Sequence, residues 1–251
     1  MSSRCPSQLL GKLDLTAKEK QDCEPLAKLG DITINPCGLI ANTLFNDVFT
    51  LNTNNSNAEF KVNEQGIAWK SDIEYKYAQP EGFKSEQCSS CDACSCDDSN
   101  QWSCKEPYLD EDGNCHRYYY PDDDTTQYLY ETYPMVVSPI EGVLNEHFIV
   151  WMRVAALPTF RKLYGWIDTK IPKDTELIFN VNANYDVMSF KGSKSLIVST
   201  TGSFGGKNDF LPMAYILVGT ITLILGILFG LKQWFYPRKL ADRSYLKFKL
   251  E

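Results

Sequence analysis

The strongest constraint on this chain is one apolar run near its C-terminus. Residues Phe210 to Leu231 read FLPMAYILVGTITLILGILFGL, 22 positions without a charged side chain. As an α-helix this run is about 33 Å long, enough to cross the roughly 30 Å hydrocarbon core of a bilayer. A core helix of a water-soluble protein seldom keeps more than about 14 wholly apolar residues. The sequence therefore predicts a membrane protein with one transmembrane helix over 210–231.

The distribution of charge predicts which part of the chain stays in the cytosol. Residues 232–251 carry six lysines and arginines against two carboxylates, whereas residues 1–209 carry 19 basic and 30 acidic side chains. By the positive-inside rule, the short basic tail over 232–251 is cytosolic, and residues 1–209 form a lumenal or extracellular domain. A large acidic external domain argues against nucleic-acid partners.

An oxidising compartment changes what the nine cysteines indicate. Six of them lie in an acidic stretch, residues 84–126, which has no apolar run and needs cross-links to hold a structure. The six are Cys88, Cys91, Cys94, Cys96, Cys104 and Cys115. Their spacing, with His116 nearby, also fits a tetrahedral zinc site. Because their number is even and the compartment oxidises thiols, we favour three local disulfides, whose pairing stays open. In the same compartment, the sequon Asn54-Asn55-Ser56 predicts N-glycosylation of Asn54.

Hydrophobic patterning predicts that the external domain is β-rich with short helical excursions. Asn35 and Pro36 resemble a helix start, and apolar residues follow at helical spacing as far as Phe49. We expect helices over residues 36–49 and 159–164, and strands over residues 148–154, 175–181, 187–190 and 195–201. The predicted fold class is an α+β, β-rich antiparallel-sheet ectodomain followed by one transmembrane α-helix and a short basic tail.

Motifs for catalysis are weak. The two histidines, His116 and His147, lie in no pattern typical of nucleophilic or zinc-dependent hydrolysis. Residues 205–208 resemble a phosphate-binding loop only superficially. Residues 110–113 resemble part of a calcium loop, but Tyr108 occupies its first ligand position, which argues against calcium binding. We therefore expect a protein that is not an enzyme and binds no cofactor or metal.

One side of the apolar helix carries small residues, which are Gly219, Thr222, Gly226 and Gly230. The spacing Gly226-x-x-x-Gly230 lets another helix approach closely, although glycine is also simply frequent in membrane helices. Since no ionisable side chain lies within the span, this helix by itself offers no ion or proton path. We predict that these small residues form a helix-packing face.

Several stretches, in order along the chain, resemble the signature of one family. They are Asn35 to Asn42 with Phe45-Asn46-Asp47, Gly66 to Trp69 with Ser71-Asp72, Asn145 through FIVWMRVAALPTFRKLYG to Gly165, and Gly205 to Asn208. The chain is similar to the non-catalytic β-subunits of type IV P-type ATPases, the phospholipid flippases. This is the cell division control protein 50, or ligand-effect modulator, family.

The resemblance implies a glycosylated β-rich ectodomain between two membrane helices, with both termini cytosolic. It implies a disulfide between Cys23 and Cys37, an insertion over residues 84–126, and an unpaired Cys5. The family's first membrane helix would precede residue 1, so we expect the chain to be truncated at its N-terminus. Departures from the family pattern include Tyr185-Asp186, where Tyr-Pro is usual.

The resemblance also implies the function. Family members bind the catalytic α-subunit of the flippase in a heterodimer, let it leave the endoplasmic reticulum, and support aminophospholipid flipping. We expect localisation to the endoplasmic reticulum, the Golgi or endosomes and the plasma membrane, in contact with membrane lipid. Arg153, Arg161 and Lys162 are predicted to contact the partner, with salt bridges inside the domain as the alternative. Other hypotheses are a single-pass adhesion or receptor ectodomain and a metal-dependent enzyme at the cysteine cluster.

Overall fold

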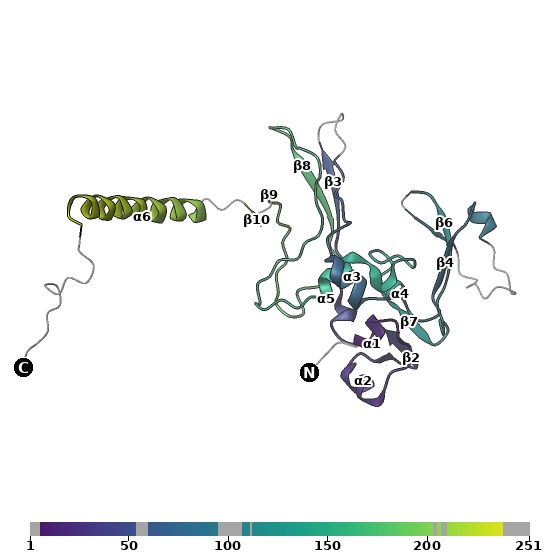
Figure 1. Ribbon diagram of the computed structural model, residues 1–251. Coiled ribbons are helices and arrows are strands. Elements are labelled where there is room, and N and C mark those ends of the chain that lie inside the picture. The colour runs from purple at the N-terminus through teal and green to yellow at the C-terminus, as the bar shows by residue number, and fades with distance from the viewer. Residues whose placement is uncertain are drawn as a thin grey trace, which may run out of the picture. The chain divides into compact units, whose positions relative to one another are not determined.

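The computed structural model describes residues 6–53, 60–94, 107–110, 112–202, 205–206 and 210–237. The chain divides into two compact units, Met1–Phe190 and Lys191–Glu251, which are considered one at a time. In the described part of the first unit, short helices and small sheets are joined by long loops (Figure 1). The combination of helices with mainly antiparallel strands confirms the predicted α+β class.

The helices in the described part of the first unit are all short. They are α1 (Pro6–Leu9), α2 (Ala17–Asp22), α3 (Lys70–Lys76), α4 (Leu129–Thr132) and α5 (Glu146–Met152), with single 3-10 turns η1 (Ala41–Thr43), η2 (Cys91–Ala93) and η3 (Gly142–Leu144). Helix α2 begins with a capping box, in which the backbone N–H of Thr16 donates to Glu19 Oε2 at 2.9 Å. Isolated helices of this length are unstable in water, so their stability comes from packing against the rest of the unit.

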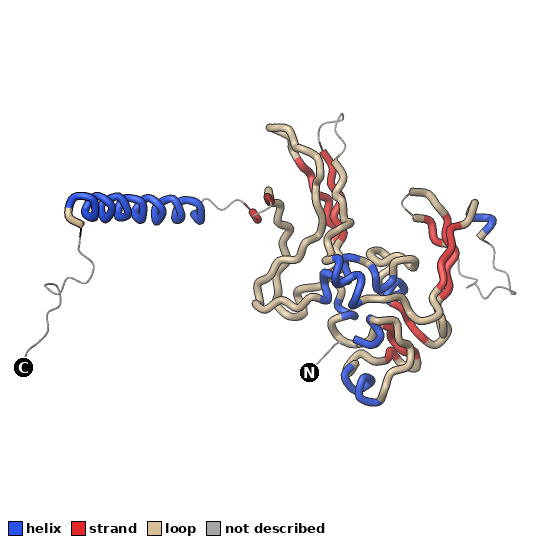
Figure 2. Tube along the Cα trace, viewed as in Figure 1, coloured by secondary structure: helices blue, strands red, loops and turns tan. Residues whose placement is uncertain are grey.

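The strands of the first unit form three small sheets among the described residues. β1 (Lys28–Leu29) pairs antiparallel with β2 (Ile32–Asn35), which pairs parallel with β7 (Thr126–Tyr128). β3 (Val48–Thr53) pairs antiparallel with β8 (Leu177–Asn182), from Val48 opposite Asn182 to Thr53 opposite Leu177. β4 (Lys84–Gln87) and β5 (Tyr108–Leu109) flank β6 (Cys115–Tyr119), also antiparallel. Long tan loops separate these strands (Figure 2).

The main core contains α5 and a group of tyrosines. Phe148 and Ile149 of α5 are completely buried. Tyr120 stacks on Tyr130 at 4.9 Å between ring centroids, and its hydroxyl donates to the carbonyl of Pro139 at 2.9 Å. Burial raises the pKa of Tyr120 well above its ordinary value. Because Tyr120 comes from residues 84–126, that stretch is joined to the main core and is not held by cross-links alone.

Two helix predictions are wrong. Residues 36–49 contain one 3-10 turn, η1, and then enter β3. Gly38 has a φ of +100°, which is incompatible with a continuous helix, and the six-residue ladder with β8 takes the chain from Val48 onward. Residues 159–164 form a loop, in which the side chain of Lys162 is bound to the end of α5.

The strand predictions were partly right. Residues 175–181 were predicted as a strand, and β8 covers most of them. Residues 148–154 belong mainly to α5, because Phe148, Ile149 and Met152 recur at helical spacing and face the core. Residues 183–200 are all described and contain no strand. The predicted meander over 187–190 and 195–201 is therefore absent, apart from Thr201 in the two-residue β9.

The second unit contains the long apolar helix. Strands β9 (Thr201–Gly202) and β10 (Gly205–Gly206) pair antiparallel, and α6 (Phe210–Phe235) follows them. α6 has 26 residues and is long and apolar enough to cross a membrane. It extends four positions beyond the predicted end at Leu231 and includes Lys232 in its last turn.

Candidate functional site

Helix α5 is the base on which the candidate site is built. The Asn145 side chain accepts a hydrogen bond from the backbone N–H of Phe148 at 3.1 Å, which caps the helix N-terminus. The amide group of Asn145 donates to the carbonyl of Val136 at 3.1 Å and to Glu141 Oε2 at 2.8 Å. The capping residue Asn145 is buried and the inner face of α5 lies in the core. The helix is therefore held in place, and the neighbouring segments bind to it.

Glu146, the first residue of α5, holds the segment that leads into α3. Its Oε1 accepts a hydrogen bond from the backbone N–H of Gly66 at 2.9 Å, and its Oε2 accepts one from Ala68 at 2.7 Å. Gly66 has a φ of +74°, which favours glycine. Hydrogen bonds to an ionised carboxylate are stronger than neutral ones, so both oxygens of Glu146 fix the position of Trp69 at the start of α3.

Asp72 of α3 connects this segment to the other end of α5. Its carboxylate is 3% exposed and accepts hydrogen bonds from Lys76 Nζ at 2.5 Å and Arg153 Nε at 2.6 Å. The Lys76 hydrogen bond, with the Arg153 charge, lowers the pKa of Asp72 against the opposing effect of burial. The Arg153 guanidinium carbon also lies 4.6 Å from the centroid of the Trp69 ring. Arg153 is therefore engaged inside the domain, which is the alternative that the sequence left open.

Lys162 closes the loop that leaves α5. Its ammonium group donates to the backbone carbonyls of Val150 at 2.7 Å, Trp151 at 3.0 Å and Arg153 at 2.5 Å. These carbonyls lie at the C-terminal end of a helix, where no intrahelical partner remains and where a cation is favourable. Residues 154–161 consequently form a loop with both ends fixed, Arg153 to Asp72 and Lys162 to α5. We call residues 154–161 the tethered loop.

The tethered loop displays apolar side chains to solvent. Val154 is 68% exposed, Leu157 is 70% exposed and Phe160 is 50% exposed. Trp69, whose ring contacts Arg153 just before the loop, is 64% exposed. Arg161 is also exposed, and it forms no ion pair within the part of the chain that the structure describes. Of the three predicted contact residues, Arg153 is paired with Asp72 and Lys162 is bound to backbone carbonyls, so only Arg161 has no such contact among the described residues. We call Trp69, Val154, Leu157, Phe160 and Arg161 the loop surface.

The chain that follows the loop is fixed as well. The backbone groups of Asn63 and Trp166 form two reciprocal hydrogen bonds of 2.8 Å. A Cβ atom on Gly165 would lie 2.6 Å from Val62 Cγ1, so this contact requires glycine. Partial burial raises the pKa of Tyr164 to about 12. The loop surface is thus flanked on both sides by rigid structure.

The described cysteines form three disulfides: Cys23–Cys37, Cys88–Cys94 and Cys91–Cys115. Cys96, Cys104, Cys5 and the sequon residue Asn54 lie outside the described residues. The described part of the chain holds no cluster of three or more histidine, cysteine or carboxylate groups suited to a metal ion.

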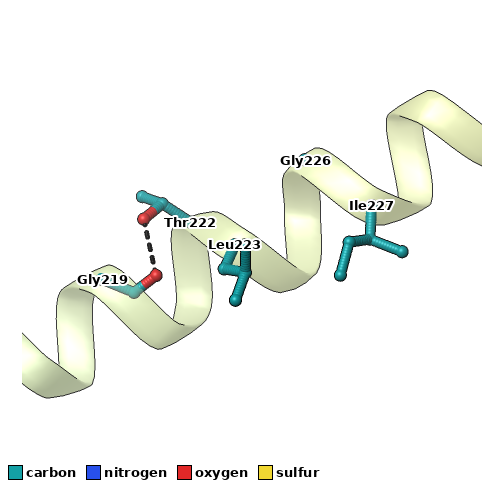
Figure 3. Close-up of a pocket in the computed structure, with 5 residues that line it drawn as sticks. All are labelled: Gly219, Thr222, Leu223, Gly226 and Ile227. Carbon is teal, nitrogen blue, oxygen red and sulfur yellow. Dashed lines mark hydrogen bonds between the residues drawn. The ribbon is translucent and has the colours of Figure 1, made fainter.

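The small residues of α6 line a shallow groove of about 470 Å³ (Figure 3). Gly219, Thr222 and Gly226 line it together with Leu223 and Ile227. The hydroxyl of Thr222 donates within the helix, to the carbonyls of Val218 at 3.0 Å and Gly219 at 2.9 Å. Gly230 lies one turn beyond Gly226 and does not line the groove. The predicted packing face is therefore open to close approach, and the Thr222 hydroxyl on it is already hydrogen-bonded within the helix.

The sequence did not single out Glu146, Asp72 or Trp69 as parts of the site. Trp69 and Asp72 belong to a stretch that carries the family resemblance, and this resemblance is the sequence feature that could have identified them as parts of the site. Their roles depend on contacts across 78 to 81 positions of the chain, which no local pattern reveals.

Comparison with known proteins gives a consistent result. A family model described as LEM3 (ligand-effect modulator 3) family / CDC50 family matches residues 1–239. ALA-interacting subunit 3 of Arabidopsis thaliana is 37% identical over 252 residues, covering 98% of this chain and 58% of the relative. Cell cycle control protein 50A of Mus musculus is 34% identical, covering 90% of this chain and 58% of the relative.

A yeast relative carries the most explicit name. Phospholipid-transporting ATPase accessory subunit CRF1 of Saccharomyces cerevisiae is 33% identical over 245 residues, covering 96% of this chain and 53% of the relative. The chain thus spans somewhat over half the length of these curated relatives. Because the family model matches nearly the whole chain, this protein belongs to the LEM3/CDC50 family.

Proposed function

We propose that this protein is the accessory β-subunit of a phospholipid-transporting type IV P-type ATPase. The observation that carries the proposal is the likeness, over nearly the whole chain, to a yeast protein named as an accessory subunit of such an ATPase. The likeness to an Arabidopsis protein named as an interacting subunit supports the same role. The partner would be the catalytic α-subunit, in a heterodimer within the membrane.

The role is non-catalytic. The ionisable groups of the described site are occupied by structural contacts: Glu146 binds two backbone amides, Asp72 binds two cations, and Lys162 binds three carbonyls. Groups held in this way stabilise a surface and are not arranged as a nucleophile with its base. What the site offers to another molecule is an apolar surface with one cation, which suits binding.

The topology follows from the charge pattern. Residues 1–209 lie on the lumenal or extracellular side, α6 crosses the bilayer, and the basic residues after it remain cytosolic. The disulfides and glycosylation of Asn54 belong to the same compartment. The complex forms in the endoplasmic reticulum and then moves to the Golgi, endosomes or plasma membrane, where it flips aminophospholipids. The small-residue face of α6, including Gly230, packs against a neighbouring helix.

Co-expression of the complete gene product with type IV P-type ATPases of the same organism, one at a time, tests the proposal. We expect at least one ATPase to co-purify with it, to leave the endoplasmic reticulum only in its presence, and to internalise fluorescent phosphatidylserine. An ATPase variant that lacks its phosphorylated aspartate controls for transport by other proteins. If every ATPase matures and flips lipid equally well without this protein, the proposal is wrong.

A further inference from the structure

We infer that the basic tail over residues 232–251, together with the last turn of α6, binds anionic phospholipid headgroups at the membrane surface. This inference rests on the topology given with the proposed function, because that topology places the tail in the cytosol. The cytosolic leaflet is the one that carries the anionic lipids of a cell membrane, phosphatidylserine among them. The ligand to which we commit is the headgroup of such a lipid within the bilayer that α6 crosses.

The length of α6 places its last turn among the headgroups. The 22 uncharged residues from Phe210 to Leu231 extend about 33 Å, which fills a hydrocarbon core of roughly 30 Å. Lys232, in the last turn, is the first charged residue beyond this span. Trp234 and Tyr236 follow it and are 83% and 78% exposed, and both residue types prefer the membrane–water interface. The ammonium group of Lys232 therefore lies at the depth of the lipid phosphates.

The basic tail has more cations than carboxylates. Its six lysines and arginines are opposed by Asp242 and Glu251, which gives a net charge of +4. Residues 238–251 lie outside the described residues and enter through their sequence alone. Each lysine or arginine near an anionic surface strengthens adsorption about fivefold, so this net charge corresponds to an effect of several hundredfold. The six cations are Lys232, Arg238, Lys239, Arg243, Lys247 and Lys249.

The other end of α6 shows no such excess of cations. Residues 201–209 carry one lysine and one aspartate, and residues 1–209 as a whole carry 19 basic against 30 acidic side chains. That net negative charge opposes adsorption of the external domain to anionic lipid. The asymmetry of charge about the span therefore confines the binding site to one leaflet.

A lipid surface is favoured over an acidic protein segment. Apolar residues alternate with lysines from Leu246 to Leu250, and such apolar side chains enter the interface while the ammonium groups stay at the headgroups. α6 also holds the tail beside the bilayer, so the headgroups are present at a high effective concentration. Because phosphatidylserine is an aminophospholipid, the tail binds a lipid of the class that the complex is proposed to deliver to this leaflet.

The test places the complete gene product in nanodiscs of phosphatidylcholine, with or without about 30% phosphatidylserine. The environment-sensitive fluorescent amino acid Anap, in place of Tyr245, reports on the tail. We expect its emission to shift to shorter wavelength when phosphatidylserine is present, because the tail then enters the membrane interface. The shift should disappear in about 0.5 M KCl, where the charges are screened.

Two triple variants, each of which loses three lysines, separate the tail from the overall charge of the protein. At about fivefold for each lysine, the tail variant weakens adsorption about a hundredfold and loses the emission shift, whereas the control variant retains it. The tail variant is Lys239→Gln with Lys247→Gln and Lys249→Gln, and the control, at exposed positions of the first unit, is Lys18→Gln with Lys170→Gln and Lys173→Gln.

Two results would overturn the inference in favour of an acidic protein partner: the same emission with and without phosphatidylserine, or an equal shift in the tail variant. Glycerophosphoserine added to phosphatidylcholine nanodiscs supplies the same headgroup free in solution, and a shift in its presence overturns the assignment to the membrane surface. The nanodiscs contain no ATPase. Failure of lipid binding therefore leaves the proposed function intact, and failure of every ATPase to co-purify leaves the nanodisc result intact.

Discussion

Replacing Lys162 with methionine tests whether the tethered loop is held as the structure indicates. Methionine keeps most of the length and the apolar stem of lysine but lacks the ammonium group, whose Nζ lies 5.6 Å from the centroid of the Trp151 ring. The change removes the ammonium group and with it the three hydrogen bonds to the end of α5. The effect on stability therefore reports on these bonds more than on packing.

The expected magnitude follows from the geometry. A hydrogen bond to a charged group contributes about 1.5–3 kcal/mol net, and a cation at a helix C-terminus adds about 0.3–1 kcal/mol. Lys162 is only partly buried, so water replaces some of the lost bonds at the carbonyls. We expect a loss of about 2 kcal/mol in the free energy of unfolding. For a domain of this size that lowers the melting temperature by about 4–8 °C.

Thermal unfolding of the purified protein in detergent, followed by tryptophan fluorescence, measures this change. Lys173→Met is the matched control, because Lys173 is exposed and lies away from the site in sequence. Lys162→Arg should recover only part of the loss, since a planar guanidinium cannot direct its donors to three converging carbonyls as an ammonium does. A melting temperature for Lys162→Met within about 1 °C of the control would refute the capping role.

Three further variants test the surroundings of the loop. Glu146→Gln leaves one of two backbone amides before α3 without its acceptor and should cost about 1–2 kcal/mol of unfolding free energy, measured by urea denaturation. Gly142→Ala should cost more than about 2 kcal/mol, because the new Cβ would lie 2.6 Å from the Tyr120 hydroxyl at a φ of +49°. The readout is increased digestion of the purified variant by protease. The hydrogen bond from Lys76, together with Arg153, lowers the pKa of Asp72. The stability that the ionised carboxylate contributes is therefore complete above an unfolded pKa of about 3.9 and is lost as pH falls through the folded value. Asp72→Asn should therefore reduce the fall in melting temperature between about pH 6 and pH 3, and an unchanged pH profile would contradict the ion pair.

Patterns confined to one element predicted the structure well. The apolar run predicted α6 because 22 uncharged residues leave few alternatives, and alternation over 175–181 predicted β8. The stretch from Phe148 was mistaken for a strand because its residues favour β-structure. Its helical spacing of buried residues and the Asn145 cap outweigh that preference, and the cap was a signal present in the sequence.

Predictions that depended on distant partners were less successful. The apolar residues between Leu39 and Phe49 fit a helix by spacing alone, but Val48 and Phe49 pair with β8, more than 130 positions later. The partners of Arg153 and Lys162 could not be chosen from sequence, because an exposed contact and an internal ion pair use the same side chains. Only the position of Asp72 relative to Arg153 distinguishes the two.

The tethers explain why two separate stretches of the chain belong to one site. Residues 66–72 and 146–165 both carry the family resemblance, and Glu146 and Asp72 bind one stretch to the other. The charged groups that look most suited to contact a partner are used for this internal connection. The exposed residues of these stretches include the apolar side chains of Trp69, Leu157 and Phe160, together with polar ones such as Lys70, Thr159 and Arg161. A partner that recognises this surface must therefore gain most of its binding free energy from burying Leu157, Phe160 and Trp69, and its dependence on salt should be weak, because ion pairs make the smaller contribution.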